Sequence, residues 1–459
     1  MLSLSEAIHS MPFKKFEKRK ITPFQILITY YSVAILISFL LLRLPGVHLE
    51  GVHVSLLDSL FMAVSAVSVT GLTTVTVAET YSSFGLAMIL LILQFGAIGI
   101  MSIGTFLWLL FGKKIGMRER QLIMIDHNQY NLSGVVSLIR QIAKLLFIIE
   151  FTGAFILTVH FKRYFATWEE SAINGVFAAI SATTNGGFDI TGMSLVPFHH
   201  DYFIQFVCMI LIFLGAIGFP VLIEVKAYLT KKDPAFRFSL FTKVTTFTYV
   251  ALFVFGSVVI FIIESFQSFK EMRWHEAAFT AMFQSVSTRS AGLTTFDVTS
   301  FNEATQLFMS ALMFIGASPS SVGGGIRTTT FAIVILFLIA FSRGQSEIQI
   351  FNREIHVIDV YRSFAVLIFA IIMVLGAAMV LFITETSATM MEVIFEITSA
   401  FGTCGMSLGI TGDLTAFGKM VIMVLMFVGR VGLISFLYSI GGSARKKKYH
   451  YPKERIIIG

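Results

Sequence analysis

The sequence predicts an all-α integral membrane protein in which four similar units follow one another in one chain. Three features support this class: an apolar composition, an alternation of long and short apolar stretches, and four polar breaks that recur at similar intervals. Of the 459 residues, 56% are hydrophobic and only 13% are charged. Soluble domains contain about 25% charged residues, so most of this chain is expected to lie in lipid.

The long apolar stretches are the expected spanning helices. A helix needs about 20 apolar residues to cross a bilayer, and eight stretches reach this length. They cover residues 22–45, 84–112, 135–161, 202–228, 239–266, 305–342, 357–386 and 412–441. The first stretch is too long for the core of a signal peptide, and no small-residue cleavage site follows it, so it is expected to span the membrane.

A shorter apolar segment lies between the two members of each successive pair of spans. Segments of about a dozen residues favour re-entrant helices over spans. They cover residues 56–69, 171–184, 275–287 and 388–402. The expected unit is therefore a spanning helix, a re-entrant pore helix, a polar loop and a second spanning helix, repeated four times.

Each re-entrant segment leads into a polar break with a glycine, and these glycines recur roughly every 110 residues. They are Gly71, Gly187, Gly292 and Gly405. The second long helix of each unit holds a further glycine at a similar offset, namely Gly96, Gly215, Gly316 and Gly429. Close helix packing alone favours small residues in membranes, but it does not explain why both sets keep the same spacing.

Irregular backbone is tolerated at membrane depth only where it lines a water-filled cavity or is buried in protein. Four breaks in register predict a pseudo-fourfold pore, in which backbone carbonyls replace the hydration shell of a cation. The carbonyl ends of the re-entrant helices would favour a cation on the same axis. The expected ion-binding residues of this selectivity filter are Val69, Thr70, Gly71, Asn185, Gly186, Gly187, Ala291, Gly292, Cys404 and Gly405.

Polar side chains within the breaks are expected to support the loops by hydrogen bonds to the backbone. They are Thr70, Thr184, Asn185, Ser290 and Thr403. The alternative interpretation is that they are ordinary caps at the ends of short helices, which is weaker for four breaks in register than for any one of them.

The distribution of basic residues predicts the orientation. Lys and Arg crowd the N-terminal segment, the linkers between units, as at Lys113 and Lys114, and the tail, as at residues 445–448. Cytoplasmic loops are enriched in positive charge, so both termini are expected in the cytoplasm and the glycine loops are expected to open from outside. The net charge of +7 follows from these clusters. Because each cluster lies beside a span, no nucleic-acid partner is expected.

The second long helix of the third unit contains a glycine-rich segment, residues 316–325, with too many Gly, Ser and Pro residues for a regular helix. It is expected to lie below the filter and to occlude the pore. The expected gating residues are Gly316, Ala317, Ser318, Ser320, Gly323, Gly324, Gly325, Arg327 and Arg430. Two alternatives stay open: a plain helix kink, and a phosphate-binding loop, although the Gly-Lys-Ser/Thr ending of such loops is missing.

Charged side chains inside spans are costly and mark functional sites by default. Arg430 is expected to face the pore below the filter or to pair with carbonyls of the glycine-rich segment; the alternative is an ion pair with Glu396. Arg289 is expected to point away from the ion path and to brace the filter. His199 and His200, in an outer loop, are interpreted as a surface pair rather than a metal site.

Together, these motifs resemble those of the membrane (ion-translocating) subunit of Ktr-type potassium uptake systems, in the Trk/Ktr/HKT superfamily, over essentially the whole chain. The matching strings are Val69-Thr70-Gly71-Leu72, Asn185-Gly186-Gly187-Phe188, Thr288-Arg289-Ser290-Ala291-Gly292, Ser399-Ala400-Phe401-Gly402-Thr403-Cys404-Gly405, residues 316–325 and Phe427-Val428-Gly429-Arg430-Val431-Gly432. The resemblance implies four M1–P–M2 repeats, one filter glycine per repeat and a gating loop in the third repeat. The chain departs from its relatives at Pro319, Arg327 and Thr184-Asn185-Gly186.

The resemblance also implies a function and partners. It implies potassium uptake across the cell membrane, stimulated by Na⁺, by a homodimer on a ring of cytosolic, nucleotide-binding regulatory subunits of the RCK type. No covalent cofactor is expected: K⁺ would be the permeant ion, Na⁺ an activator, and the nucleotide would bind to the partner. Gly71 matches the potassium-selective pattern, whereas relatives with serine there tend toward Na⁺. The alternative is a Na⁺-permeable or weakly selective monovalent cation channel of the same superfamily.

The expected organisation is a cytoplasmic N-terminal segment, four repeats and a cytoplasmic tail. The boundaries are 1–21 for the N-terminal segment, 22–112 for repeat 1, 113–228 for a linker and repeat 2, 229–342 for a linker and repeat 3, 343–441 for a linker and repeat 4, and 442–459 for the tail. No polar stretch is long enough for a nucleotide-binding domain, so regulation is expected from a partner. A secondary cotransporter would be expected to show an inverted repeat. An enzyme is not expected, because His-Glu-x-x-His and Gly-x-Ser-x-Gly motifs are missing.

Overall fold

The computed structural model describes residues 23–99, 116–126, 135–231, 236–345, 347–441 and 454. The described chain is helical, with one short two-stranded hairpin. Several expectations lie outside the described residues: the N-terminal segment, nearly all of the tail, the end of the span predicted over 84–112, and the basic pair Lys113 and Lys114.

Four long helices and four short ones follow the expected order. The long helices are α2 (Pro23–Leu42), α8 (Val135–Phe161), α12 (Leu240–Glu264) and α16 (Val357–Thr384). Each is long and apolar enough to cross a membrane. The short helices are α3 (Leu56–Ser68), α9 (Trp168–Thr183), α13 (Trp274–Ser287) and α17 (Met390–Gly402). They coincide closely with the four predicted re-entrant segments, so these helices are confirmed.

Local sequence signals explain where the short helices begin. The Ser55 side chain accepts a hydrogen bond from the Asp58 N–H at the start of α3. Helices α9 and α17 begin with complete capping boxes, in which Thr167 and Thr389 occupy the first position. A capping box satisfies backbone donors that the first turn leaves unpaired, so a short helix can start at a defined residue within an apolar protein.

The second helix of each unit is interrupted. Helix α5 (Ser83–Ile98) ends before Gly99, and α14 (Glu303–Ile315) is separated from α15 (Thr328–Ser342) by the glycine-rich segment. Helices α10 (Tyr202–Ala216) and α11 (Phe219–Lys231) meet at 103°, and α18 (Ala416–Val431) and α19 (Leu433–Gly441) meet at 101°.

The continuous helices predicted over 202–228 and 412–441 are therefore wrong. Gly218 and Gly432 lie at the two bends with φ of 102° and 91°, and a left-handed residue cannot continue a right-handed helix. Within the described residues, four helices can span a membrane singly and up to six spans result if each bent pair counts as one. The number of eight spanning helices stays a prediction.

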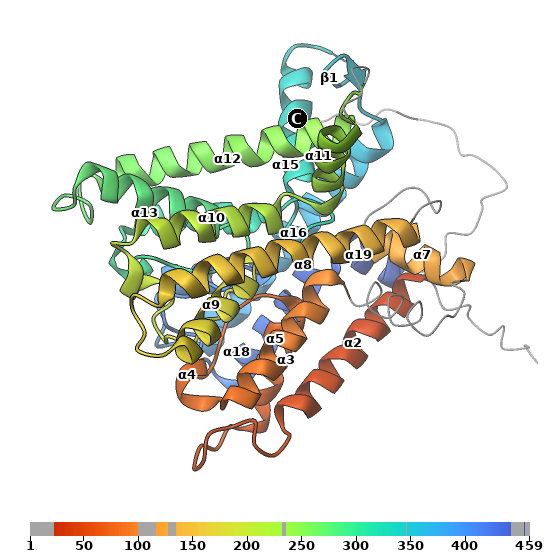
Figure 1. The fold of residues 1–459 in the computed structure, drawn as a ribbon. Coiled ribbons are helices and arrows are strands. Elements are labelled where there is room, and N and C mark those ends of the chain that lie inside the picture. Colours follow the sequence, from red (N-terminus) through yellow and green to blue (C-terminus); the bar gives the residue numbers. More distant parts are fainter. Residues whose placement is uncertain are drawn as a thin grey trace, which may run out of the picture.

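The remaining elements are small. They are α4 (Val77–Thr80), α7 (Met117–Asp126), the 3₁₀ turns η1 (Val196–Phe198) and η2 (Val298–Ser300), and the antiparallel strands β1 (Gln349–Ile350) and β2 (Arg353–Glu354). Figure 1 shows α8 and α12 running across the molecule in a similar direction, with the β1–β2 hairpin projecting at one end.

The second helix of each unit packs against the short helix of the next unit. The packed pairs are α5 with α9, α10 with α13, α14 with α17, and α18 with α3. The last pair returns to the first unit, so the pattern closes on itself. Large buried side chains such as Phe61, Phe177, Phe283 and Phe401 lie on the four short helices, and the ends of these helices therefore sit in the core.

Candidate functional site

The four glycine loops share one backbone conformation. In each loop the filter glycine and the residue two positions before it have positive φ, and the residue between them does not. The values are 55° for Val69 and 93° for Gly71, 52° for Asn185 and 68° for Gly187, 87° for Ser290 and 72° for Gly292, and 48° for Thr403 and 98° for Gly405. Left-handed values are costly for residues with a Cβ. Their recurrence at one place in four loops indicates that the surroundings impose the conformation.

The loops meet beside Gly187. A Cβ atom at Gly187 would lie 3.1 Å from the carbonyl oxygen of Ala291, 3.2 Å from that of Thr70 and 3.3 Å from that of Cys404. Three carbonyl oxygens from three other loops therefore surround one point. Each belongs to the residue that precedes a filter glycine.

Each of the four filter glycines lies close to the backbone of a neighbouring loop. A Cβ at each would collide with, or press on, the carbonyl oxygen of the residue before the filter glycine in another loop. The pairs are Gly71 with Gly186, Gly187 with Ala291, Gly292 with Cys404, and Gly405 with Thr70. These pairs link the first loop to the second, the second to the third, the third to the fourth, and the fourth to the first. The four loops thus form a closed ring of carbonyl oxygens, which we call the carbonyl ring.

The four oxygens of the carbonyl ring accept no hydrogen bond from any group in the described part of the chain. Buried backbone carbonyls are nearly always paired with a donor. The four unpaired oxygens of the carbonyl ring are therefore available to a cation or to water.

A serine near the end of each short helix holds the loop that follows it. The backbone N–H groups of Gly71 and Gly405 donate to the hydroxyls of Ser65 and Ser399, both at 3.1 Å. In the other two loops the serine hydroxyl donates instead to a backbone carbonyl just after the filter glycine. The two further pairs are Ser181 with Phe188 and Ser287 with Leu293.

These four serines were missing from the sequence-based prediction, although a detectable pattern marks them. Each lies five or six positions before a filter glycine. Of the side chains predicted to support the loops, Thr184 bonds back to its own helix at the Ile180 carbonyl, 2.7 Å away. The Asn185 amide is buried, and neither of its polar atoms has a hydrogen-bond partner among the described residues.

The glycine-rich segment is buried and is held by backbone hydrogen bonds to the second unit. The Ser318 N–H donates to the Ala216 carbonyl at 3.1 Å, and the Val322 N–H donates to the Gly215 carbonyl at 3.3 Å. Within the third unit, the Ala317 N–H donates to the Gly324 carbonyl at 3.1 Å. The segment therefore leaves the α14 helix and closes against the bend between α10 and α11.

Ser290 connects the glycine-rich segment to the filter. Its hydroxyl accepts a hydrogen bond from the Gly324 N–H at 3.1 Å and lies 2.8 Å from the Thr403 carbonyl oxygen, to which it donates. One side chain in the third filter loop thus contacts both the fourth filter loop and the segment. The segment lies directly against the residues that set the ring.

Arg430 is nearly buried and spans from the fourth unit to the third and the first. Its guanidinium donates to the Val322 carbonyl of the glycine-rich segment and to the Gly96 carbonyl of α5. Pairing with the segment was one of the two expected arrangements. The alternative partner, Glu396, instead accepts hydrogen bonds from Ser407 at 2.7 Å and Thr411 at 2.6 Å.

The other two arginines also bind backbone carbonyls. Arg327 donates to the carbonyls of Ser318 and Gly323, within the segment itself. Arg289 is fully buried, donates to the Tyr249 carbonyl of α12 at 2.5 Å and lies 4.0 Å from the Tyr249 ring centroid. It therefore ties the third filter loop to α12. The predicted functional roles of all three arginines stay predictions.

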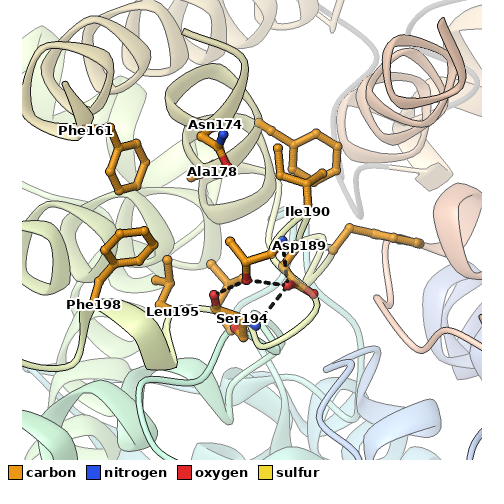
Figure 2. Close-up of a pocket in the computed structure, with 12 residues that line it drawn as sticks. Phe161, Asn174, Ala178, Asp189, Ile190, Ser194, Leu195 and Phe198 are labelled. Atoms are coloured by element: carbon orange, nitrogen blue, oxygen red, sulfur yellow. Dashed lines mark hydrogen bonds between the residues drawn. The ribbon is translucent and has the colours of Figure 1, made fainter. Parts of the chain in front are cut away.

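A small apolar pocket lies just outside the second filter loop (Figure 2). Phe161 and Phe198 line it together with the residues that follow Gly187. The Asp189 carboxylate at its edge accepts hydrogen bonds from the Thr191 hydroxyl at 2.9 Å and the Ser194 N–H at 2.9 Å. The Asp189 carboxylate thus fixes the turn that follows the second filter loop, and it accepts these hydrogen bonds from within that turn.

The apolar helices and the buried carbonyl ring define a helical, multi-pass membrane protein. Residues 5–440 match the model of the TrkH family, described as a cation transport protein. The chain belongs to this family, and its resemblance to the membrane subunit of Ktr-type systems is confirmed.

Two bacterial relatives match over almost their whole length. The chain is 51% identical to Ktr system potassium uptake protein D of Bacillus subtilis (strain 168), over 97% of this chain and 99% of the relative. It is 32% identical to the potassium/sodium uptake protein NtpJ of Enterococcus hirae, over 97% of this chain and 99% of the relative. A crystal structure of the potassium transporter TrkH from Vibrio parahaemolyticus has a TM-score of 0.68 at 19% identity, covering 92% of this chain and 85% of that one. This last likeness supports the fold.

Proposed function

We propose that the chain carries K⁺ into the cell, and that the carbonyl ring is its selectivity filter. The observation that carries the proposal is the convergence of four carbonyl oxygens, one from each loop, without hydrogen-bond donors. Such oxygens replace the hydration shell of an alkali cation. The names of the bacterial relatives, potassium uptake proteins, support K⁺ as the ion.

The proposal includes four M1–P–M2 repeats around one pore. In repeat 1, α2, α3 and α5 take the three places; in the later repeats the second spanning place is taken by a broken helix. The cyclic packing of second helices against the next short helix supports this assignment. The proposed repeat boundaries are 22–112, 113–228, 229–342 and 343–441. The basic residues of the N-terminal segment, the linkers and the tail support cytoplasmic termini and filter loops that open to the outside.

The glycine-rich segment is the proposed gate. Its burial, its hydrogen bonds to the second unit and the two Arg430 bonds support a closed position below the filter. Opening would break the bonds to the second unit and the bond from Arg430 to Val322. Control is assigned to a separate cytosolic regulatory subunit, because relatives are named as members of a Ktr system. A nucleotide-binding ring under a homodimer and Na⁺ as an activator belong to the proposal through the sequence resemblance alone.

Growth of a potassium-uptake-deficient bacterium at low K⁺ tests the proposal, with uptake of labelled K⁺ and Na⁺ measured in the same cells. The informative pair is Gly71→Ser and Gly51→Ser. Both glycines have positive φ, 93° and 82°, but only Gly71 would press a Cβ onto a filter carbonyl, whereas Gly51 has no heavy atom within 4 Å.

We expect wild type and Gly51→Ser to restore growth, and Gly71→Ser to lose the preference for K⁺ over Na⁺. Equal ion preference in all three would remove Gly71 from the filter. Uptake of Na⁺ and K⁺ without preference by the wild type would favour a weakly selective cation channel instead.

A further inference from the structure

We propose that His199, His200 and Glu276 form an outward-facing site for a transition-metal dication of the Zn²⁺ class. The two histidines lie between η1 and α10, in the second unit. Glu276 lies in the first turn of α13, the short helix of the third unit. The sequence alone shows only an adjacent histidine pair, because the carboxylate comes from a different unit.

The ligand atoms are already gathered at metal-binding separations. One carboxylate oxygen of Glu276 lies 3.0 Å from Nδ1 of His200 and 3.7 Å from Nε2 of His199. One ligand atom from each residue lies within 4.8 Å of the others. Two ligands bound to one tetrahedral Zn²⁺ lie about 3.4 Å apart, because each Zn–N or Zn–O bond is about 2.1 Å. The two separations measured from the Glu276 oxygen, 3.0 Å and 3.7 Å, bracket this value.

The orientation of His199 suits a metal ligand. Its Nδ1 lies 3.3 Å from the Val196 carbonyl oxygen, which can only accept, so Nδ1 is the donor and Nε2 faces Glu276. Metal-bound histidines almost always donate their other ring N–H to a carbonyl or carboxylate in this way. The Gln205 amide donates to the His199 carbonyl at 2.5 Å and holds the backbone of the pair.

Neighbouring aromatic rings keep the two elements together. The Tyr202 ring at the start of α10 lies 5.7 Å from the His275 ring and 4.9 Å from the Phe279 ring of α13, between centroids. The site is open to solution on one side, since the side chains of His199 and His200 are 33% and 73% exposed, whereas that of Glu276 is 14% exposed. Water can therefore complete the coordination.

The ligand set selects the class of ion. Two imidazoles and one carboxylate are a known zinc combination, and imidazole suits Zn²⁺, Cu²⁺ and Ni²⁺. Mg²⁺ and Ca²⁺ prefer oxygen ligands throughout. A bound ion would join the outer loop of the second unit to the helix that leads into the third filter loop.

Calorimetric titration of the purified full-length chain with Zn²⁺ tests the site, using a purification tag without histidine. We expect saturable binding of one Zn²⁺ per chain that excess Mg²⁺ does not displace. Acidification should weaken binding, since the imidazole nitrogens must be free of protons.

The variants His200→Ala and Glu276→Gln should each lower the affinity at least about tenfold, as losses of even outer-shell partners do. His53→Ala, which removes another exposed histidine, is the matched control and should bind as wild type does. Each variant is checked for a monodisperse chromatographic profile, and His200 is exposed enough that folding should not depend on it. Unchanged affinity in both site variants, or no saturable binding in the wild type, would overturn the proposal. The readout is binding, so it stands or falls separately from K⁺ transport.

Discussion

Four glycines with positive φ bring four unpaired carbonyl oxygens together, so single atoms decide what the site can hold. At each of these glycines a methyl group would meet the backbone of another loop. The strain of a positive φ costs roughly 1–2 kcal/mol for a residue with a Cβ. The collision of a Cβ with a carbonyl of the ring is a second, separate effect. Substitutions at glycines inside and outside the ring can distinguish backbone strain from this collision.

Gly405→Ala and Gly409→Ala separate strain from obstruction within one loop. Their φ values are 98° and 103°, but a Cβ at Gly405 would collide with the Thr70 carbonyl, whereas Gly409 has open space. We expect Gly405→Ala to lower the K⁺ uptake rate at least about tenfold, which corresponds to 1.4 kcal/mol. Gly409→Ala should lower only thermal stability. Similar uptake rates for the two variants in proteoliposomes would contradict the assignment.

Ser399→Ala tests the serine clamp. It removes the hydroxyl that accepts from the Gly405 N–H in a buried place, which should cost about 1–3 kcal/mol of stability. The ring should also loosen and distinguish K⁺ from Na⁺ less well. Ser257→Ala removes only a bond from a hydroxyl to its own helix at the Phe253 carbonyl and serves as the control. Thermal unfolding and ion competition measure the two effects, and a Ser399→Ala variant with unaltered ion competition would show that the clamp does not shape the filter.

At the scale of elements, the glycine-rich segment is held by partners from the second and fourth units, and through Arg430 it is linked to the first. The second unit binds its backbone at Ser318 and Val322, and Arg430 of the fourth unit joins Val322 to Gly96 of the first. A segment with so few apolar side chains has little hydrophobic burial of its own. Its position therefore depends on these polar contacts.

Arg430→Met should release the segment while keeping most of the side-chain volume. We expect faster K⁺ uptake by the purified chain in proteoliposomes, because the closed segment loses the hydrogen bond from Arg430 to the Val322 carbonyl, and with it the link to Gly96 of α5. Arg430→Lys retains a charge and a hydrogen-bond donor, so its K⁺ uptake rate should lie between those of the wild type and Arg430→Met. A monodisperse Arg430→Met protein with wild-type or slower uptake would argue against a gate held by this arginine.

Asp201, which caps the start of α10 outside the span, makes the stability of the protein sensitive to pH. Burial acts to raise the pKa of this carboxyl, but hydrogen bonds from His160, Tyr164 and the Ile204 N–H outweigh it, and the pKa lies below its ordinary value of 3.8. A lowered pKa adds stability above the ordinary value, and this stability is lost as the pH falls through the folded value.

Asp201→Asn should therefore melt at a lower temperature than wild type near neutral pH. The difference should begin to shrink as the pH falls below about 4, where the carboxyl of the unfolded chain starts to bind protons, and should vanish only below the lower pKa of the folded state. Melting curves across this range provide the measurement. A difference that stays constant down to acid pH would assign the effect of Asp201 to its shape rather than its charge.

The elements also show which features the sequence predicts and why others escape it. The short helices are predictable because an apolar length and a capping box are local features, as at Thr167 and Thr389. The bend at Gly218 is harder to predict, because its surroundings are tertiary: a Cβ at Gly218 would lie 2.8 Å from the Pro319 carbonyl oxygen of another unit.

At the scale of the whole molecule, the filter glycines could be predicted because four similar breaks recur at similar spacing. Contacts between units could not. Neither the meeting of Glu276 with His200 nor the bond from Arg430 to Gly96 leaves a trace in local sequence. Such contacts become visible only when the units pack in a cycle, each second helix on the next short helix.

In the proposed filter, four main-chain oxygens, one from each unit, bind a dehydrated alkali ion at one point. Anomalous diffraction from crystals of the protein grown in Rb⁺ measures this directly. We expect an Rb⁺ peak enclosed by the carbonyl oxygens of Thr70, Gly186, Ala291 and Cys404. We also expect that added Na⁺ does not displace this Rb⁺. Rb⁺ peaks elsewhere in the protein, with none among these four oxygens, would contradict it.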